Sequence, residues 1–232
     1  MALPYFYVAQ IEADAITLDE DASKHITQVL RMKAGEELML TNGKGAKAKG
    51  HITDDHRKRC VVTIDKRESE PAAPVKIAVA ISLVKNAARF EWFLEKATEI
   101  GVQEIIPLLC ERTEKEKFRQ DRLQNILTSA MLQSQQCWMP VLHEPTPFSK
   151  AVEVTSFQQK FIAHCLENEK QSLVSLATHQ SAIILIGPEG DFTQREIDLA
   201  IQHNFQPVTL GRTRLRTETA GIVAATLLCN QQ

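Results

Sequence analysis

Two loops of this chain carry residue types that can bind a flat ligand or an anion. The first comprises residues 187–191 (GPEGD), directly after the apolar run AIILI. Gly187 and Gly190 permit close backbone approach and a positive φ, and Pro188 stiffens the turn between them. Such a loop can offer backbone donors and acceptors to a ligand. On these residues alone, it could equally be a tight turn from strand to helix.

The second loop, residues 211–219 (GRTRLRTET), places arginines and hydroxyl groups between the run QPVTL and the apolar segment AGIVAATLLC. A helix N-terminus favours anions through its free N–H groups and its dipole, and Arg214 and Arg216 strengthen that preference. An RNA phosphate or the carboxylate of a cofactor can be held here. The alternative is that these arginines are solvated or pair with carboxylates across an interface.

Signatures of other nucleotide-binding and metal-binding classes are missing from the sequence. There is no G-x-x-x-x-G-K-[ST] phosphate loop, no G-x-G-x-x-G after the first α/β strand and no H-E-x-x-H. The seven histidines are dispersed, and the five cysteines are scattered without a C-x-x-C pair. We therefore expect reduced thiols, no disulfide framework and no metal site.

The chain is weakly acidic overall but locally basic. A net charge of −2 argues against nucleic acid, because phosphate binding relies on clustered lysine and arginine. One short stretch nevertheless concentrates basic residues: Lys44, Lys47, Lys49, His51, Arg57, Lys58, Arg59, Lys66 and Arg67. This run is either an RNA-binding surface or a solvated face. With no signal-peptide pattern and no apolar run near the roughly 20 residues that span a bilayer, we expect a cytoplasmic protein with no membrane association.

The elements that must position the two loops fall into two groups. In the N-terminal part, short segments rich in β-branched or aromatic residues predict a small β-barrel or sandwich. These segments are 5–8, 15–18, 36–42, 46–52 and 60–65. Ser23 is expected to cap a short helix over 24–31. The polar segment 67–74 (RESEPAAP) then predicts a linker and a domain boundary.

After the linker the apolar pattern becomes that of an α/β domain. A strand at 75–83, a helix that ends at Gly101 and a strand at 102–109 form a βαβ unit, which implies a parallel sheet. Further strands are expected at 160–164, 182–186 and 206–210, and helices at 121–136, 194–204 and 218–230. Thr193 and Glu196 have the spacing of a capping box. Ligands of such sheets bind beyond the carboxyl ends of the strands, where both loops lie.

These loops also carry a resemblance to a known family. IGPEGD followed by LGRTRLRTETA resembles the signature of the SPOUT-class ribosomal RNA small subunit methyltransferase E family, which methylates N3 of a uridine. KHITQVLRMKAGEEL is similar to the start of that family's PUA-like barrel, and LVKNAARFEWFLEKATEIGVQEIIPLLCERT resembles its first βαβ unit. The chain departs from the family at Asp191, where a second glycine is usual. It also departs at Leu132 and Gln136, which replace the Glu and Arg of E-Q-x-G-R, and at Lys24, which replaces a histidine.

The resemblance implies a fold in two parts. Residues 1–70 would form a PUA-like β-barrel RNA-binding domain, and residues 74–232 a SPOUT α/β methyltransferase domain, threaded as a trefoil knot from about Phe161. It also implies S-adenosylmethionine as the cofactor, a homodimer, and uridine 1498 of 16S ribosomal RNA in an assembled or nearly assembled small subunit as the target. The apolar face of the last helix, including Ile222 and Leu227, is compatible with a dimer, although burial within one subunit would give the same pattern.

Residue roles follow as hypotheses. The expected cofactor-binding residues are His164, Leu166, Ile186, Gly187, Pro188, Gly190, Leu210, Gly211, Leu215, Arg216 and Thr217. Uridine N3–H is a weak acid, so a nearby cation would favour its deprotonated form. Arg216 is the first candidate for that role, and Glu218 or Glu189 could accept the proton. The expected RNA-binding residues are His25, Arg31, Lys44, Lys47, Lys49, Arg57, Lys58, Arg59 and Arg214.

Two other functions stay open at this point. One is a knotted methyltransferase that acts on a ribose 2′-hydroxyl or a transfer RNA base. The other is a non-catalytic RNA-binding or ribosome-assembly protein, which need not bind S-adenosylmethionine.

Overall fold

The computed structural model of the protein describes residues 3–114, 118–153, 155–166 and 170–230. The chain divides into two compact units: Met1–Ala72 with Met131–Met139, and Ala73–Ala130 with Pro140–Gln232. The first division falls inside the expected linker 67–74. The excursion of residues 131–139 into the first unit was not expected, because the sequence assigned this segment to the second domain. The ends of the expected domains, residues 1–2 and 231–232, lie outside the described residues.

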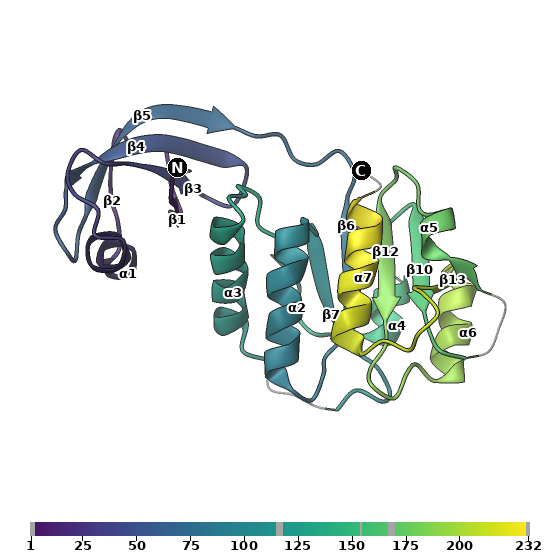
Figure 1. Ribbon diagram of the computed structural model, residues 1–232. Helices are drawn as coiled ribbons and strands as arrows, with labels where there is room; N and C mark the ends of the chain where they lie inside the picture. The colour runs from purple at the N-terminus through teal and green to yellow at the C-terminus, as the bar shows by residue number, and fades with distance from the viewer. Residues whose placement is uncertain (1–2, 115–117, 154, 167–169, 231–232) are drawn as a thin grey trace. The chain divides into compact units, whose positions relative to one another are not determined.

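The first unit is built on a five-stranded sheet in the order β1-β3-β4-β5-β2. Its strands are β1 (Tyr5–Tyr7), β2 (Ala15–Thr17), β3 (Glu37–Thr41), β4 (Ala46–Asp54) and β5 (Val61–Ser69). Alternate apolar side chains of β3 and β4 face one core, in which Leu38 and Leu40 are fully buried. The sheet curls around this core (Figure 1), and no hydrogen-bonded pair joins β1 to β2 in the described part of the chain. The expected β-barrel is therefore an open half-barrel.

The expected helix cap at Ser23 is wrong. The helix begins earlier, as α1 (Glu20–Lys24), and continues as the π-helical turn η1 (His25–Val29). Asp19 is the cap, because its side chain accepts a hydrogen bond from the backbone N–H of Ala22. Ser23 is fully buried, and its hydroxyl accepts from the N–H of Cys60 at 2.9 Å. Ser23 therefore joins the helix to the residue before β5.

The second unit is an α/β fold on one parallel sheet, as the βαβ pattern predicted. Its strands follow the order β11-β13-β10-β12-β6-β7-β8, and β9 pairs with β7. They are β6 (Ile77–Ser82), β7 (Glu104–Leu109), β8 (Val141–Leu142), β9 (Thr146–Pro147), β10 (Gln159–Ala163), β11 (Gln171–Ser172), β12 (Ala182–Ile186) and β13 (Gln206–Thr209). Every residue of β6 and β12 is buried, because helices cover both faces of the sheet.

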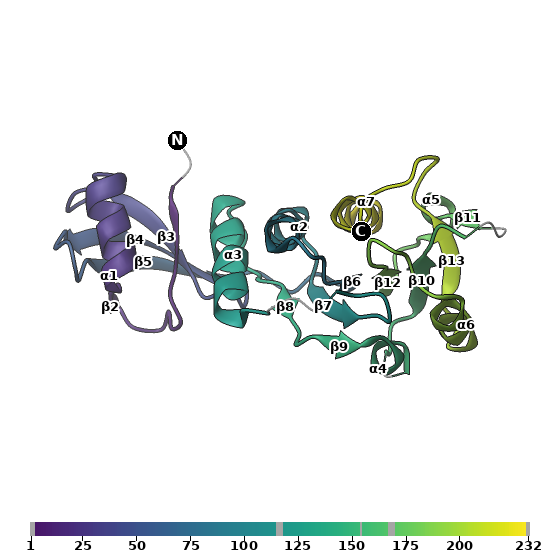
Figure 2. The ribbon, with the colours of Figure 1, turned by 90° about the horizontal axis from the view of Figure 1, so that it is seen from below.

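Helices α2 (Ala87–Ile100) and α7 (Thr217–Cys229) pack side by side on one face of the sheet, and α4 (Phe148–Glu153) and α6 (Gln194–Gln202) lie on the other (Figure 2). Two further α-helices of the described residues follow α2 in the sequence: α3 (Gln120–Gln133) and α5 (Leu173–Leu176). Gly101 ends α2 with a φ of 95°, as expected, and the predicted capping box of Thr193 and Glu196 starts α6. Across the described ranges, no helix is long and apolar enough to cross a membrane.

Residues 131–139, here called the returning segment, are held on the first unit by backbone and side-chain hydrogen bonds. The N–H of Gly45 donates to the carbonyl of Cys137 at 2.8 Å, and Lys44 forms an isolated antiparallel bridge with Trp138. The indole N–H of Trp138 donates to the carbonyl of Glu70 at 3.0 Å. Gly45 has a φ of 89°, and a Cβ there would lie 2.4 Å from the Trp138 ring. Only glycine allows the ring to lie this close to the turn.

Candidate functional site

The carboxyl ends of three neighbouring strands meet at one edge of the parallel sheet. β10 lies between β12 and β13, and Ala163 is in register with Ile186 on one side and with Val208 on the other. The two loops that the sequence singled out follow β12 and β13. The sheet therefore brings them to the same edge, on either side of the loop that follows β10.

Two adjoining pockets of about 490 and 380 Å³ open between these loops. Both are lined by Ala163, Cys165, Arg214, Leu215 and Ala220. The larger pocket is completed by Arg89, Ile186, Gly187, Pro188, Glu189, Asp191, Arg216 and Thr217. The smaller is completed by His164, Lys170, Val208, Thr209, Leu210, Gly211, Arg212 and Thr213. The walls thus include every expected cofactor-binding residue except Leu166 and Gly190.

The loop after β12 is shaped by a turn and by close packing. The N–H of Asp191 donates to the carbonyl of Pro188 at 2.9 Å, and Asp191 itself has a φ of 63°. Gly187 and Gly190 do not use the positive φ that glycine permits, and the left-handed position of this loop is Asp191. A Cβ at Gly187 would lie 3.1 Å from the Phe192 ring, so a larger residue here would be crowded against that ring.

Two side chains from other parts of the second unit fasten the same loop. Thr217, the first residue of α7, donates its buried hydroxyl to the carbonyl of Gly187 at 3.0 Å. Arg112, in the loop after β7, donates to the carbonyl of Gly190 at 2.6 Å. The Thr217 bond connects the two loops directly, so that they form the wall of one site.

Asp191, where the sequence departs from its family, joins the loop after β12 to the loop after β10. One carboxylate oxygen accepts from the N–H of Cys165 and the other from the N–H of Phe192, each at 2.8 Å. Two N–H donors on a carboxylate are charge-assisted hydrogen bonds, which are stronger than neutral ones. The acidic side chain therefore has a structural use that a second glycine could not provide.

His164 is a buried, neutral polar group in the smaller pocket. It is only 7% exposed, and neither ring nitrogen has a hydrogen-bond partner in the described residues. Burial lowers the pKa of His164, and the Lys170 ammonium lowers it further. Lys170 is held by the carbonyls of His164 and Leu166, each at 2.7 Å. The imidazole can therefore donate one hydrogen bond and accept another without carrying charge.

The arginines of the second loop are available to an anionic ligand. Arg212, Arg214 and Arg216 are exposed, and no ion pair involves any of them within the described chain. Gly211 has a φ of 152°. The hydroxyl of Thr209, two residues earlier, donates to the carbonyl of Gly211 at 2.8 Å. The described residues therefore supply no carboxylate partner for these arginines, and the alternatives of solvated arginines or of pairing across an interface stay open.

Arg89, on α2, links two carboxylates that the sequence proposed as proton acceptors. Its Nη1 donates to Oε1 of Glu189 at 3.1 Å, and its Nε lies 3.7 Å from Oε1 of Glu218. Glu189 lines the larger pocket, whereas Glu218 is 7% exposed and its Oε2 has no partner in the described part of the chain. Arg89 is thus the cation that compensates a buried carboxylate.

Sequence reasoning missed Arg89, Arg112 and the structural part of Asp191. Each acts on a backbone or carboxylate group far away in the chain, so spacing offers no signal for it. The sequence offered one hint of these two residues. Each is a cation in the segment that follows a strand: Arg89 lies in the first turn of α2, after β6, and Arg112 lies in the loop after β7.

The basic residues of the first unit divide into paired and unpaired groups. Lys47 pairs with Glu68 and Glu70, Lys49 with Glu37 at 2.8 Å, and Lys58 with Glu20. No ion pair in the described ranges involves five other exposed members of the expected RNA-binding set: His25, Arg31, Lys44, Arg57 and Arg59. The basic side chains that can bind an RNA phosphate without first breaking an ion pair therefore belong to this second group.

Comparison with known proteins identifies both units. Residues 71–229 match the model of an RNA methyltransferase domain, and residues 18–65 match that of an RNA methyltransferase PUA domain. Ribosomal RNA small subunit methyltransferase E of Synechocystis sp. is 30% identical over 223 residues, which are 93% of this chain and 73% of that protein. The protein of the same name from Bacillus subtilis is 26% identical over 236 residues, covering 95% of this chain and 91% of that one.

Solved structures agree over the whole chain. A structure described as "probable rRNA-methyltransferase from Porphyromonas gingivalis" has a TM-score of 0.92 and 37% identity, and the match covers 99% of this chain and 98% of that one. Ribosomal RNA small subunit methyltransferase E from Neisseria gonorrhoeae, solved bound to S-adenosyl methionine, has a TM-score of 0.87 and 27% identity over 97% of this chain and 95% of that one.

Proposed function

The chain belongs to the ribosomal RNA small subunit methyltransferase E family, and from this premise we propose that it methylates N3 of uridine 1498 in 16S ribosomal RNA with S-adenosylmethionine. The observation that carries the proposal is the pair of adjoining pockets built from loops 187–191 and 210–216, joined by the Thr217–Gly187 hydrogen bond. Its first unit is the PUA-like RNA-binding part and its second the SPOUT-class methyltransferase part. The trefoil knot that the resemblance implies is proposed for the region from Phe161 onward.

The pockets suit S-adenosylmethionine in size, shape and polarity. Their volumes of about 490 and 380 Å³ lie in the usual range of ligand sites. Backbone groups of Ile186, Gly187, Leu210 and Leu215 line them, and the partnerless ring nitrogens of His164 offer a neutral donor and acceptor. When bound, the cofactor supplies a methyl group on a positively charged sulfur.

The unpaired arginines support the acceptor half of the reaction. Arg216 lines the larger pocket and stands at the N-terminus of α7, where the helix dipole adds to its positive field. In this position the guanidinium favours a uridine that has lost its N3 proton. Of the two candidate acceptors for that proton, Glu189 lines the pocket and Glu218 does not, so Glu189 is the one we retain. Arg214, which lines both pockets, is placed to hold an RNA phosphate.

A homodimer acting in the cytoplasm on an assembled or nearly assembled small subunit is part of the same proposal. Its support from this chain is the composition of α7, whose half-buried residues include Ile222, Val223, Thr226 and Leu227. An apolar stripe of this kind on a helix at the site edge is what a second subunit would cover.

The test is the product itself. Mass spectrometry of 16S ribosomal RNA from cells that lack the gene should show loss of one N3-methyluridine, and the wild-type gene should restore it. Arg216→Ala should restore little or none, while the purified variant still binds S-adenosylmethionine. A modification that persists without the gene would contradict the proposed target, and full turnover by Arg216→Ala would contradict the assigned role of Arg216.

A further inference from the structure

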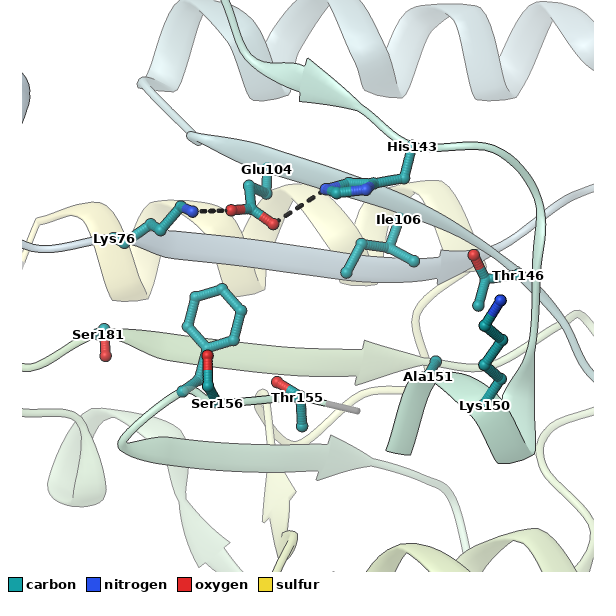
Figure 3. Close-up of a pocket in the computed structure, with 11 residues that line it drawn as sticks. Lys76, Glu104, Ile106, His143, Thr146, Lys150, Ala151, Thr155, Ser156 and Ser181 are labelled. Atoms are coloured by element: carbon teal, nitrogen blue, oxygen red, sulfur yellow. Dashed lines mark hydrogen bonds and ion pairs between the residues drawn. The ribbon is translucent and has the colours of Figure 1, made fainter. Parts of the chain in front are cut away.

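A second kind of pocket lies on the face of the parallel sheet that carries α4, and it runs from Lys76 and Glu104, at the amino ends of β6 and β7, to Thr146 and Lys150 (Figure 3). It has a volume of about 340 Å³ and is bounded by the helix α4 and the segment before β10 (Figure 3). Its lining residues are Lys76, Glu104, Ile106, His143, Thr146, Lys150, Ala151, Thr155, Ser156, Phe157 and Ser181. It shares no lining residue with the two pockets of the candidate active site.

One end of this pocket is closed by an ion pair and a hydrogen bond to one carboxylate. The Glu104 residue is 8% exposed, and Lys76 contacts one of its carboxylate oxygens. His143 Nε2 lies 3.0 Å from the other oxygen (Figure 3). Both oxygens of the only carboxylate in the lining are therefore occupied, so the pocket presents no free negative charge to a ligand.

The rest of the lining offers two hydrogen-bond donors without partners among the described residues: Lys150, at the other end, and Thr155, beside Ser156 (Figure 3). Lys150 is exposed and forms no ion pair with any described residue. The hydroxyl oxygen of Thr155 is buried and has no hydrogen-bond partner among the described residues, although such groups are normally satisfied. Thr146 already donates to the carbonyl of Glu144 at 2.8 Å, so it can only accept. A cation and a free hydroxyl without a competing carboxylate fit an oxyanion.

Between the two ends the lining also includes apolar side chains. Ile106 lies between the ion-paired end and Lys150 (Figure 3), and Ile106 and Phe157 are only partly buried, packed at the margin of the core. A partly buried isoleucine and phenylalanine in a pocket that also holds a cation fit the flat body of a ligand that carries an oxyanion.

We propose that this pocket binds a nucleoside monophosphate unit, with its phosphate on Lys150 and Thr155 and its base on Ile106 and Phe157. The nucleotide is either free or part of an RNA strand, since the binding chemistry is the same. The inference rests on the pocket and does not require the methyl transfer proposed above.

The test is NMR of the full chain labelled at isoleucine δ1 methyl groups. Titration with uridine 5′-monophosphate should shift the Ile106 signal saturably and leave that of Ile26, in the first unit, unchanged. Lys150→Gln and Thr155→Val, alone and combined, should weaken this binding, by roughly tenfold for the lysine. Lys96→Gln on α2, at the opposite face of the sheet, is the matched charge control and should bind as wild type.

Comparing several ligands distinguishes a free nucleotide from RNA and shows which results would overturn the proposal. If only a short oligouridine shifts Ile106, the natural ligand is RNA; if the monophosphate suffices, a free nucleotide is bound. Equal binding of unphosphorylated uridine would overturn the anion site, and equal binding of inorganic phosphate would overturn the base site. No shift with any of these ligands, or no effect of the two substitutions, would overturn the proposal, even in an enzyme with full methyltransferase activity.

Discussion

Arg89 holds the loop after β12 against the first turn of α7 through one carboxylate from each. Without its guanidinium, Glu189 loses a 3.1 Å hydrogen bond and the buried Glu218 loses its compensating cation. We expect Arg89→Ala to weaken S-adenosylmethionine binding by about tenfold in calorimetry, because one charged hydrogen bond that orders the pocket wall is lost. Arg122→Ala is the control, since Arg122 contacts Glu91 on the same helix, away from the pocket walls.

A charge exchange distinguishes positioning by Arg89 from a general effect on folding. Arg89→Glu combined with Glu189→Arg should recover part of the affinity that Arg89→Glu alone loses. Unchanged cofactor affinity in Arg89→Ala would show that the contact does not shape the pocket.

His164 should make the protein less stable in mild acid. Burial lowers its pKa in the folded state, so the unfolded chain binds more protons as the pH falls through about 6.5. Stability is therefore fully present above that pH and declines below it, by at most about 1.4 kcal/mol per pH unit for one group. Urea unfolding between pH 5 and pH 8 measures this slope. His164→Gln should flatten it relative to His179→Gln, whose histidine is exposed; identical slopes would exclude His164 as the cause.

At the scale of elements, the turn at Gly45 and the returning segment depend on each other. Gly45→Ala combines a left-handed backbone with a Cβ that would lie 2.4 Å from the Trp138 ring. Gly35 has a similar φ of 92° but no atom within 4 Å of an added Cβ, which makes Gly35→Ala the matched control for backbone strain. We expect about 1 kcal/mol of destabilisation for Gly35→Ala and at least about 2 kcal/mol for Gly45→Ala.

Tryptophan fluorescence shows whether the contact between the Trp138 ring and the turn at Gly45 is lost. In a Trp92→Phe background, Trp138 is the remaining tryptophan, and its emission should shift to the red in Gly45→Ala but not in Gly35→Ala. Equal unfolding free energies for the two variants would show that the contact between the ring and the turn contributes little.

The long elements could be predicted because their burial leaves a clear pattern. The fully buried strands β6 and β12 read as continuous apolar runs, and α2 and α6 carry Gly101 and the capping box at their ends. The strands β8, β9 and β11 have two residues each, which is too short for any period to show, and α4 and α5 are only slightly longer. Ser23 was misplaced because its partner Cys60 is distant in sequence, and a buried serine looks like a cap in sequence alone.

Over the whole molecule, the acidic total charge conceals how the basic residues are used. Lys49 is paired with Glu37, whereas Lys44, Arg57 and Arg59 have no ion pair in the described part of the chain. We expect each of the latter, when changed to glutamine, to reduce the slope of log affinity against log salt by about 0.8, the value for one lost phosphate contact. Lys49→Gln should change it less. Binding of a 16S RNA fragment at several salt concentrations measures this, and slopes that do not separate the two groups would contradict the assignment.

The returning segment also decides how this chain can be divided. Because residues 131–139 belong to the first unit, a single proteolytic cut between Ala72 and Ala73 leaves part of that unit on the C-terminal fragment. The Gly45–Cys137 and Trp138–Glu70 hydrogen bonds would still join the two fragments after such a cut. The RNA-binding part is therefore not an exchangeable N-terminal module. Grafting it onto another methyltransferase requires transplanting two separate stretches of sequence together.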